Sequence, residues 1–255
     1  LIRQSAELVL SATPLDLTSP LSPDSHESEL LSDAQALIAE IAARRQALTV
    51  ELPKRLSVST LITLKEDPEN FALSLRRPLP RHIDLSARRG TDFHNWIEEK
   101  YKSPKLIDNE FEDAMDYYED LPLNELQEKW LASTWSARTP TEIEVGFETM
   151  LGGRGGILIR GRIDAVYPRL GSDGAEDGGF EVVDWKTGRE KSGEDLDIAA
   201  IQLAAYRLAY SKLKGIPLEK ISAAFHYVGS NTTVRPADLL NEEALLEIIT
   251  GSLRT

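Results

Sequence analysis

Hydrophobic residues along this chain recur first with the period of a helix and later with the period of a strand. The helical spacing predicts helices over residues 28–47, 59–66, 68–75, 90–101 and 193–213, and from 241 onward. The period of two predicts strands at 142–147, 157–167, 180–186 and 221–228, with glycine-rich turns at 152–156 and 172–179. This order of elements predicts an α/β fold with a small mixed central sheet flanked by helices.

The N-terminal part follows a different pattern. The first 28 residues contain three prolines among Ser, Thr and Asp, a composition that favours irregular chain. The helix predicted at 28–47 carries one apolar stripe, which we expect to be buried. We therefore expect residues 1–56 to be a linker and helix from an upstream region, and residues 57–255 to form the main domain. The first residue is Leu1 rather than Met, which suggests a segment of a longer polypeptide.

The charge balance and the residue types that are absent narrow the possible functions. The chain has 29 Lys and Arg against 42 Asp and Glu, a net charge of −13, which excludes a polycation that binds nucleic acid without specificity. It has no cysteine, which excludes disulfides, thiolate zinc sites, cysteine nucleophiles and a cysteine-held iron–sulfur cluster. No apolar stretch reaches roughly 18 residues and no signal peptide is recognisable, so we expect a cytoplasmic protein with no membrane partner.

One basic segment stands out in this acidic chain. Residues 76–89 hold five arginines and a single acid, and we expect the arginines to contact DNA phosphates. These arginines are Arg76, Arg77, Arg81, Arg88 and Arg89. Residues 107–128, by contrast, hold nine acids and no basic residue, which predicts a solvated loop followed by the start of a helix.

Two predicted strands carry polar residues with the spacing of one strand face. Alternation places Arg160, Arg162 and Asp164 on one face of the first strand, and Asp184 and Lys186 on one face of the next. Two neighbouring carboxylates repel each other unless a cation such as Mg²⁺ lies between them, and a nearby lysine could activate water or stabilise phosphoryl charge. A structural Asp–Lys ion pair is the alternative interpretation. The two arginines could contact phosphate or pair with acids.

The segments IDAVY and VVDWKTG resemble the core of the PD-(D/E)XK nuclease superfamily, in its RecB-type exonuclease branch. The segment GTDFHNWIEEKY is similar to the upstream helix of this branch and supplies His94. The segment IQLAAYRLAY is similar to its Gln-x-x-x-Tyr motif and supplies Gln202 and Tyr206, which lie on one helical face. The resemblance runs from about residue 57 to the C-terminus and implies a restriction-endonuclease-like core.

The resemblance also implies a role for each motif residue in the hydrolysis of a DNA phosphodiester by metal-activated water. The implied ligands of Mg²⁺ or Mn²⁺ are His94, Asp164, Asp184 and the backbone carbonyl of Val183. The implied catalytic residues are Asp164, Asp184 and Lys186, with Gln202 and Tyr206 orienting the substrate strand and the lysine. Glu144 matches an acidic position of the family, but it could equally be a solvated glutamate that faces outward.

A further resemblance concerns the context of this domain. Residues 57–80 resemble the segment that precedes the nuclease in the C-terminal region of UvrD/Rep-type DNA helicases, although the chain has no GxxxxGK[ST] phosphate-binding loop of its own. This implies an exonuclease domain of a helicase–nuclease that processes DNA ends in recombination and repair. Its implied partners are DNA, helicase domains upstream in the same polypeptide and a second helicase–nuclease subunit. The alternatives are a catalytically silent DNA-binding or scaffolding module and a stand-alone structure-selective endonuclease.

Overall fold

The computed structural model of the chain describes residue 11 and residues 25–45, 51–78, 85–101 and 121–251. The chain divides into two units, Leu1–Thr49 and Val50–Thr255, and each is described by itself. Most of the predicted linker and most of the acidic segment 107–128 lie outside the described residues. No helix in the described ranges combines the length and the apolar character that crossing a membrane would require.

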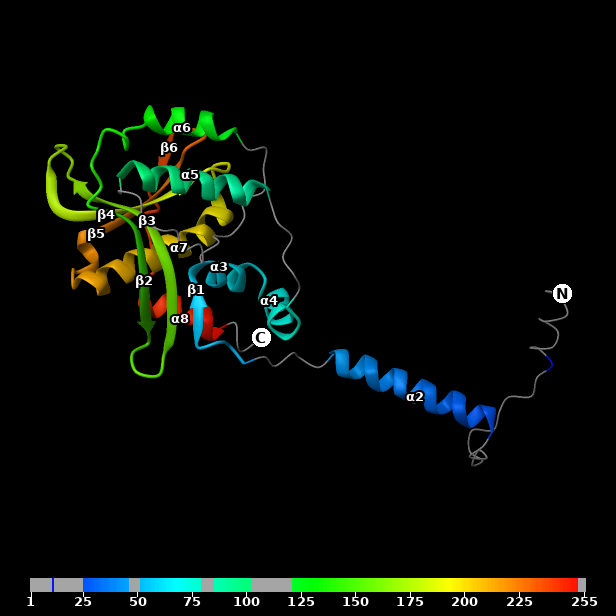
Figure 1. Ribbon diagram of the computed structural model, residues 1–255. Helices are drawn as coiled ribbons and strands as arrows, with labels where there is room; N and C mark the ends of the chain where they lie inside the picture. Colours follow the sequence, from blue (N-terminus) through cyan, green and yellow to red (C-terminus); the bar gives the residue numbers. More distant parts are fainter. Residues whose placement is uncertain (1–10, 12–24, 46–50, 79–84, 102–120, 252–255) are drawn as a thin grey trace. The chain divides into compact units, whose positions relative to one another are not determined.

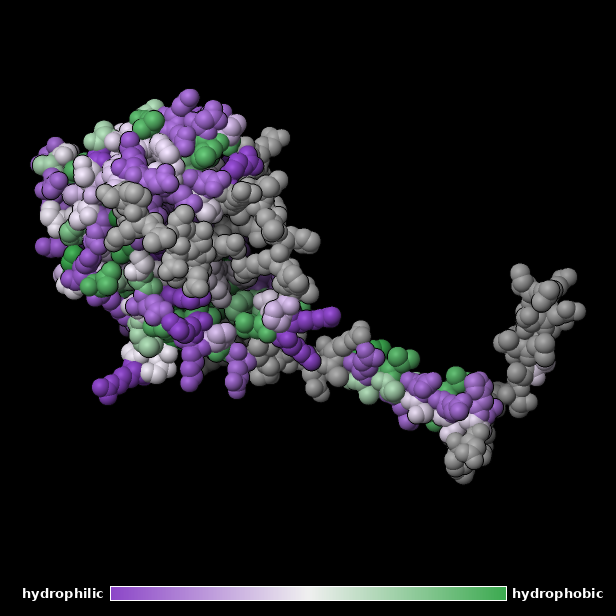
Figure 2. All heavy atoms as spheres, in the orientation of Figure 1, coloured by the Kyte–Doolittle hydropathy of each residue, from purple (hydrophilic) through white to green (hydrophobic). Residues whose placement is uncertain are grey.

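The first unit contains the predicted N-terminal helix, α2 (His26–Arg45). Its apolar stripe is exposed, with between 46% and 66% of each large side chain accessible, and Figure 2 shows green apolar surface along this helix. The side chains of the stripe are Leu30, Leu31, Leu37, Ile38 and Ile41. Within the first unit, no described residue covers this stripe, so the expectation that it is buried is not met there.

The second unit is built on a six-stranded mixed sheet. The strands are β1 (Arg55–Ser57), β2 (Glu142–Leu151), β3 (Ile157–Leu170), β4 (Glu176–Lys186), β5 (Ile221–Tyr227) and β6 (Thr232–Val234). Their order is β1-β3-β4-β5-β6, with β2 paired to β3. The strands β2, β3 and β4 form the expected antiparallel meander, and β5 lies parallel to β4. The unpredicted strands β1 and β6 have three residues each, too few to show a period of two.

Helices cover both faces of this sheet, as expected (Figure 1). They are α3 (Val58–Glu66), α4 (Pro68–Arg76), α5 (Leu85–Tyr101), α6 (Leu123–Leu131), α7 (Gly193–Lys214) and α8 (Glu242–Gly251). The larger hydrophobic cluster packs α3, α7 and α8 against one face. The smaller, aromatic-rich cluster packs α5 and α6 against the other. The predicted α/β class, a mixed sheet flanked by helices, is confirmed.

Local signals in the sequence explain several element ends. The carboxylate of Asp67 accepts a hydrogen bond of 2.9 Å from the backbone N–H of Asn70, and Pro68 fills the first turn of α4, where its missing N–H costs nothing. At the tip of the β2–β3 hairpin, a Cβ on Gly156 would lie 1.7 Å from the carbonyl oxygen of Leu151. Only glycine can occupy this position of the turn.

Near the middle of the pairing of β2 with β3, the side chains switch from one face of the sheet to the other. Ile143 pairs with Ala165, and Val145 pairs with Ile163. The first pair packs in the smaller cluster, whereas the second packs in or against the larger cluster. The two positions are only two residues apart on each strand, a spacing that would normally keep them on one face. Glu144, between the two positions of β2, has a φ of 49° in the left-handed region. Regular alternation in β3 is therefore interrupted between Ile163 and Ala165, after the positions of Arg160 and Arg162.

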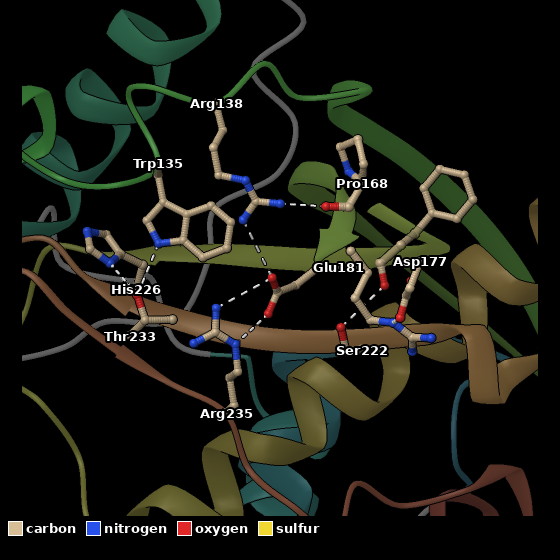
Figure 3. A network of polar contacts seen from close by, with 11 residues as sticks. Trp135, Arg138, Pro168, Asp177, Glu181, Ser222, His226, Thr233 and Arg235 are labelled. Carbon is tan, nitrogen blue, oxygen red and sulfur yellow. Dashed lines mark hydrogen bonds and ion pairs between the residues drawn. The ribbon is translucent and has the colours of Figure 1, made fainter. Parts of the chain in front are cut away.

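A polar network lies on the face of β4 that carries the smaller cluster (Figure 3). The carboxylate of Glu181, only 4% exposed, accepts a hydrogen bond of 2.6 Å from Arg235 Nε and lies 3.8 Å from a terminal nitrogen of Arg138. The guanidinium of Arg138 stacks 4.8 Å from the centre of the Trp135 ring. Two cations thus compensate one buried carboxylate, and they tie the segment after α6 and the segment after β6 to the sheet.

His226 is buried at the end of this network. The indole N–H of Trp135 donates a hydrogen bond of 3.0 Å to Thr233 Oγ1, which lies 3.0 Å from His226 Nδ1. Because the hydroxyl already accepts from Trp135, its own hydrogen can be donated to the imidazole. Burial, with the charge of Arg235, lowers the pKa of His226 to about 4. His226 is therefore neutral at physiological pH.

We expect this histidine to destabilise the second unit in acid. A pKa that falls from 6.5 to about 4 on folding contributes stability above pH 6.5, and this contribution is lost as the pH falls towards 4. The loss attributable to His226 between pH 6.5 and 4.5 should be about 2–3 kcal/mol, measured by urea unfolding. His226→Gln should lack this component, and His26→Gln in exposed α2 is the matched control. Equal pH dependence in all three proteins would contradict the expectation.

Candidate metal centre

Three potential metal ligands from three different elements meet in the second unit. They are His94 on α5, Glu144 on β2 and Asp164 on β3, and their ligand atoms all lie within 4.8 Å of one another. His94 Nδ1 is 3.4 Å from Asp164 Oδ1 and 3.8 Å from Glu144 Oε1. Imidazole nitrogen and carboxylate oxygen are donors that suit divalent cations such as Mg²⁺ and Mn²⁺. The donor set therefore fits the expected metal.

The position of His94 follows from the packing of α5. Phe93 and Ile97 are fully buried in the smaller cluster, together with Trp130 of α6, so the predicted core face of this helix is confirmed. His94 follows Phe93 and lies at the edge of this face, with its side chain 22% exposed. The helix is thus anchored by apolar contacts on one side, while its histidine reaches the carboxylates of β2 and β3.

Each carboxylate of the group has one oxygen held by the protein and the other directed towards His94. Asp164 Oδ2 accepts a hydrogen bond of 2.7 Å from the backbone N–H of Trp185, which leaves Oδ1 facing the imidazole. Glu144 Oε2 lies 2.8 Å from Arg162 Nε, which leaves Oε1 facing the imidazole. The two oxygens that face His94 and the imidazole nitrogen define the candidate metal centre.

The charges of this centre are strongly coupled. Burial by itself would lower the pKa of His94, but the negative charges of Asp164 and Glu144 outweigh burial and raise the pKa well above its usual value. Burial, followed by the charge of Asp164, raises the pKa of Glu144, although His94 and Arg162 act in the opposite direction. A protonated His94 therefore compensates the carboxylates here, and a divalent cation would take over that role.

The residues of the Asp-x-Lys and Gln-x-x-x-Tyr motifs form a second polar group. Lys186 Nζ lies 3.0 Å from Asp184 Oδ2 and donates a hydrogen bond of 3.0 Å to Gln202 Oε1. The amide nitrogen of Gln202 donates to Asp184 Oδ1 and to the hydroxyl of Tyr206, both over 2.9 Å. Helix α7 thus brings Gln202 and Tyr206 against the end of β4, as their spacing of four residues predicted.

The two groups are connected through Trp185. This residue lies between Asp184 and Lys186, and its backbone N–H holds Asp164. No sequence signal indicates this contact, because every residue except proline has a backbone N–H. The carboxylate of Asp184 is engaged by Lys186 and Gln202 and is not a member of the three-residue group. Metal ligation by Asp184 and by the carbonyl of Val183 stays a prediction.

Glu144 belongs to the candidate metal centre, which the sequence had left open. Its side chain is only 6% exposed, so it is not a solvated glutamate that faces outward. Arg162 pairs with it, which favours the pairing interpretation of that arginine over a free phosphate contact. Arg160 lies on the same strand and is exposed.

The predicted basic segment is described only in part. Arg76, at the end of α4, and Arg77, directly after it, are exposed. Arg89 lies on α5, one residue before Gly90, where an added Cβ would lie 3.6 Å from Thr187 Oγ1 in the loop after Lys186. Arg81 and the side chain of Arg88 lie outside the described residues. Phosphate binding by these arginines stays a prediction.

Comparison with known proteins agrees with this geometry. The model of the PD-(D/E)XK nuclease superfamily matches residues 55–249, and the chain belongs to this superfamily. The mixed sheet with helices on both faces is consistent with its restriction-endonuclease-like fold. No curated protein matches the sequence significantly. The crystal structure of SSO0001 is similar at 17% identity and a TM-score of 0.42, over 86% of this chain and 87% of that chain, which adds nothing about activity.

Metal binding at this centre should release a proton. His94 must be neutral to bind an ion, and its pKa is raised, so Mn²⁺ affinity should increase as the pH rises through the neutral range. Isothermal titration in two buffers of different ionisation enthalpy measures the affinity and the proton release together. His94→Ala should bind more weakly and release fewer protons, whereas His26→Gln should resemble the wild type. Identical affinity and proton release in the His94 variant would exclude His94 as a ligand.

Proposed function

We propose that this chain is a divalent-metal-dependent deoxyribonuclease with exonuclease activity. One observation carries the proposal. In a chain of the PD-(D/E)XK superfamily, His94, Glu144 and Asp164 meet beside the Asp184–Lys186 pair. The proposed cofactor is Mg²⁺ or Mn²⁺, because carboxylate oxygens predominate among the donors. The proposed substrate is the phosphodiester backbone of DNA.

The buried polar groups suit the hydrolysis of a phosphodiester. A bound divalent ion would supply charge neutralisation for the phosphate and a water of lowered pKa. The ammonium group of Lys186 is held as a hydrogen-bond donor by Gln202 and lies next to Asp184, which supports an electrostatic role for it beside the phosphate. Gln202, fixed in turn by Tyr206, orients both the lysine and Asp184. These side chains hold one another through hydrogen bonds and an ion pair, which favours a fixed geometry for the proposed reaction.

The proposed context is a helicase–nuclease that processes DNA ends in recombination and repair. The resemblance of residues 57–80 to the segment that precedes the nuclease in UvrD/Rep-type helicases supports this context. Residues 57–255 would be the RecB-type nuclease domain, and residues 1–56 would lead to it from helicase domains of the same polypeptide. A second helicase–nuclease subunit is a further proposed partner.

Cleavage assays test the activity. With Mg²⁺ or Mn²⁺, the chain should degrade linear single-stranded or duplex DNA but not circular DNA, because an exonuclease needs an end. Asp164→Asn should lower the rate by roughly 10²-fold or more because it removes a charged metal ligand, and Lys186→Met should do the same because it removes a positive charge beside the phosphate. Arg55→Gln, which breaks the exposed ion pair with Glu148, should retain wild-type cleavage. Cleavage of circles would instead indicate an endonuclease, and a folded, metal-binding chain without cleavage would indicate a silent DNA-binding module.

The basic segment predicts salt-dependent binding of DNA. Replacing Arg76, Arg77 and Arg89 together with glutamine should weaken binding of single-stranded DNA and lower the slope of log K against log salt by about 2, at roughly 0.7 per phosphate contact. Fluorescence anisotropy in EDTA measures binding without cleavage. Arg169→Gln, whose arginine is already ion-paired with Asp177, is the control for loss of charge. An unchanged slope in the triple variant would remove these arginines from the DNA path.

A further inference from the structure

The carboxylate of Glu144 is held by Arg162, an arginine that lies next to the candidate metal centre. Arg162 Nε is 2.8 Å from Glu144 Oε2, and the side chains are 31% and 6% exposed, respectively. The other oxygen of Glu144, Oε1, lies 3.8 Å from His94 Nδ1. The ion pair therefore uses the outer oxygen of Glu144 and leaves the inner oxygen facing the centre.

The backbone of Glu144 shows that this orientation has an energetic cost. Among the described residues other than glycine, only Glu144 and Asn231 have a positive φ, of 49° and 54°. Asparagine tolerates the left-handed region, whereas this conformation is strained for glutamate in a strand. Such a conformation persists only where surrounding contacts compensate for it. The ion pair with Arg162, at 2.8 Å, is shorter than the contact of this side chain with His94, at 3.8 Å.

Strand register explains how Arg162 reaches Glu144. Arg162 on β3 lies directly opposite Gly146 on β2, so Glu144 is its diagonal neighbour, within reach of a long side chain. Gly146 has no side chain that could occupy the space beside the arginine. Arg162 also precedes Asp164 by two residues on the same strand. One strand thus supplies a carboxylate of the centre and the group that holds the other carboxylate.

We propose that Arg162 is a positioning residue of the metal centre. It fixes the outer oxygen of Glu144 so that the inner oxygen joins Asp164 Oδ1 and His94 Nδ1 in one ligand set before the metal arrives. The backbone N–H of Trp185 holds Asp164 in the same way, with one oxygen bound and one free. The inference rests on the proposed function, since it assumes that a divalent cation binds here.

A positioning arginine and a bystander arginine have opposite effects on metal affinity. A bystander cation repels a metal ion, so removing it should tighten metal binding or leave it unchanged. A positioning residue orients a ligand, so removing it should weaken metal binding although the site becomes more negative. The sign of the change therefore separates the two roles.

The test is Mn²⁺ affinity measured by isothermal titration in the absence of DNA. Arg162→Gln should raise the Kd about tenfold or more, a typical effect of losing an outer-shell partner. Arg162→Lys should lie closer to the wild type, because lysine can still pair with Glu144. Arg162→Gln combined with Glu144→Gln should bind no more weakly than Glu144→Gln alone, because both changes remove the same ligand. Arg55→Gln, which breaks the pair with Glu148 on the same strand β2, is the matched control.

The possible outcomes separate this inference from the proposed function. If the folded wild type binds no Mn²⁺, the metal centre and the role of Arg162 are both overturned. If the wild type binds Mn²⁺ and Arg162→Gln binds it equally or more tightly, only the positioning role is overturned. Thermal melts without metal show whether each variant is folded. Should Arg162→Gln fail to fold, Arg162→Lys decides instead: its Kd should lie between those of the wild type and Glu144→Gln, and a Kd equal to or below that of the wild type would overturn the proposal.

Discussion

The structure depends on keeping three carboxylates, Glu144, Asp164 and Asp184, out of water in one region of the second unit. Buried carboxylates are unfavourable unless cations or hydrogen-bond donors compensate them. Arg162 pairs with Glu144, Lys186 and Gln202 hold Asp184, and the backbone of Trp185 together with His94 compensates Asp164. Each of these partners is positioned by one feature of the fold. The antiparallel pairing of β2 with β3 places Arg162, the packing of α5 places His94, and the packing of α7 places Gln202.

The two hydrophobic clusters anchor the helices that position these polar residues from the two faces of the sheet. The smaller cluster contains Trp130, Trp135 and Trp185 and anchors α5, which brings the histidine from one face of the sheet. The larger cluster anchors α7, which brings Gln202 and Tyr206 from the other face. Asp184 lies on β4 between Val183 and Trp185, which both pack in the smaller cluster, while Val182 on the same strand packs in the larger cluster. The polar residues are thereby held on rigid elements rather than on loops, which favours preorganised chemistry.

Much of the fold could be predicted from the sequence because its main elements are long and strongly periodic. The alternation in β2, β3 and β4 and the helical spacing of α5 and α7 are local properties of the chain, visible without any partner. The three-residue strands β1 and β6 could not be predicted, because their pairing arises from distant neighbours. The exposed apolar stripe of α2 shows a second limit of sequence patterns. Periodicity indicates that a helix face could be buried, but not that anything covers it.

For the site, residue types and motif spacing are enough to name candidates for the proposed chemistry. His94, Asp164, Asp184, Lys186, Gln202 and Tyr206 could all be named from motif order and spacing. Tertiary structure alone decided which oxygen of each carboxylate is free, and that Glu144 joins the centre. Three features arise from contacts between residues distant in the chain. They are the switch of faces at Glu144, the ion pair of Arg162 with Glu144 across the strand pair, and the hydrogen bond from the N–H of Trp185 to Asp164. Local periodicity carries no information about such contacts, because they exist only after the strands have paired and the helices have packed.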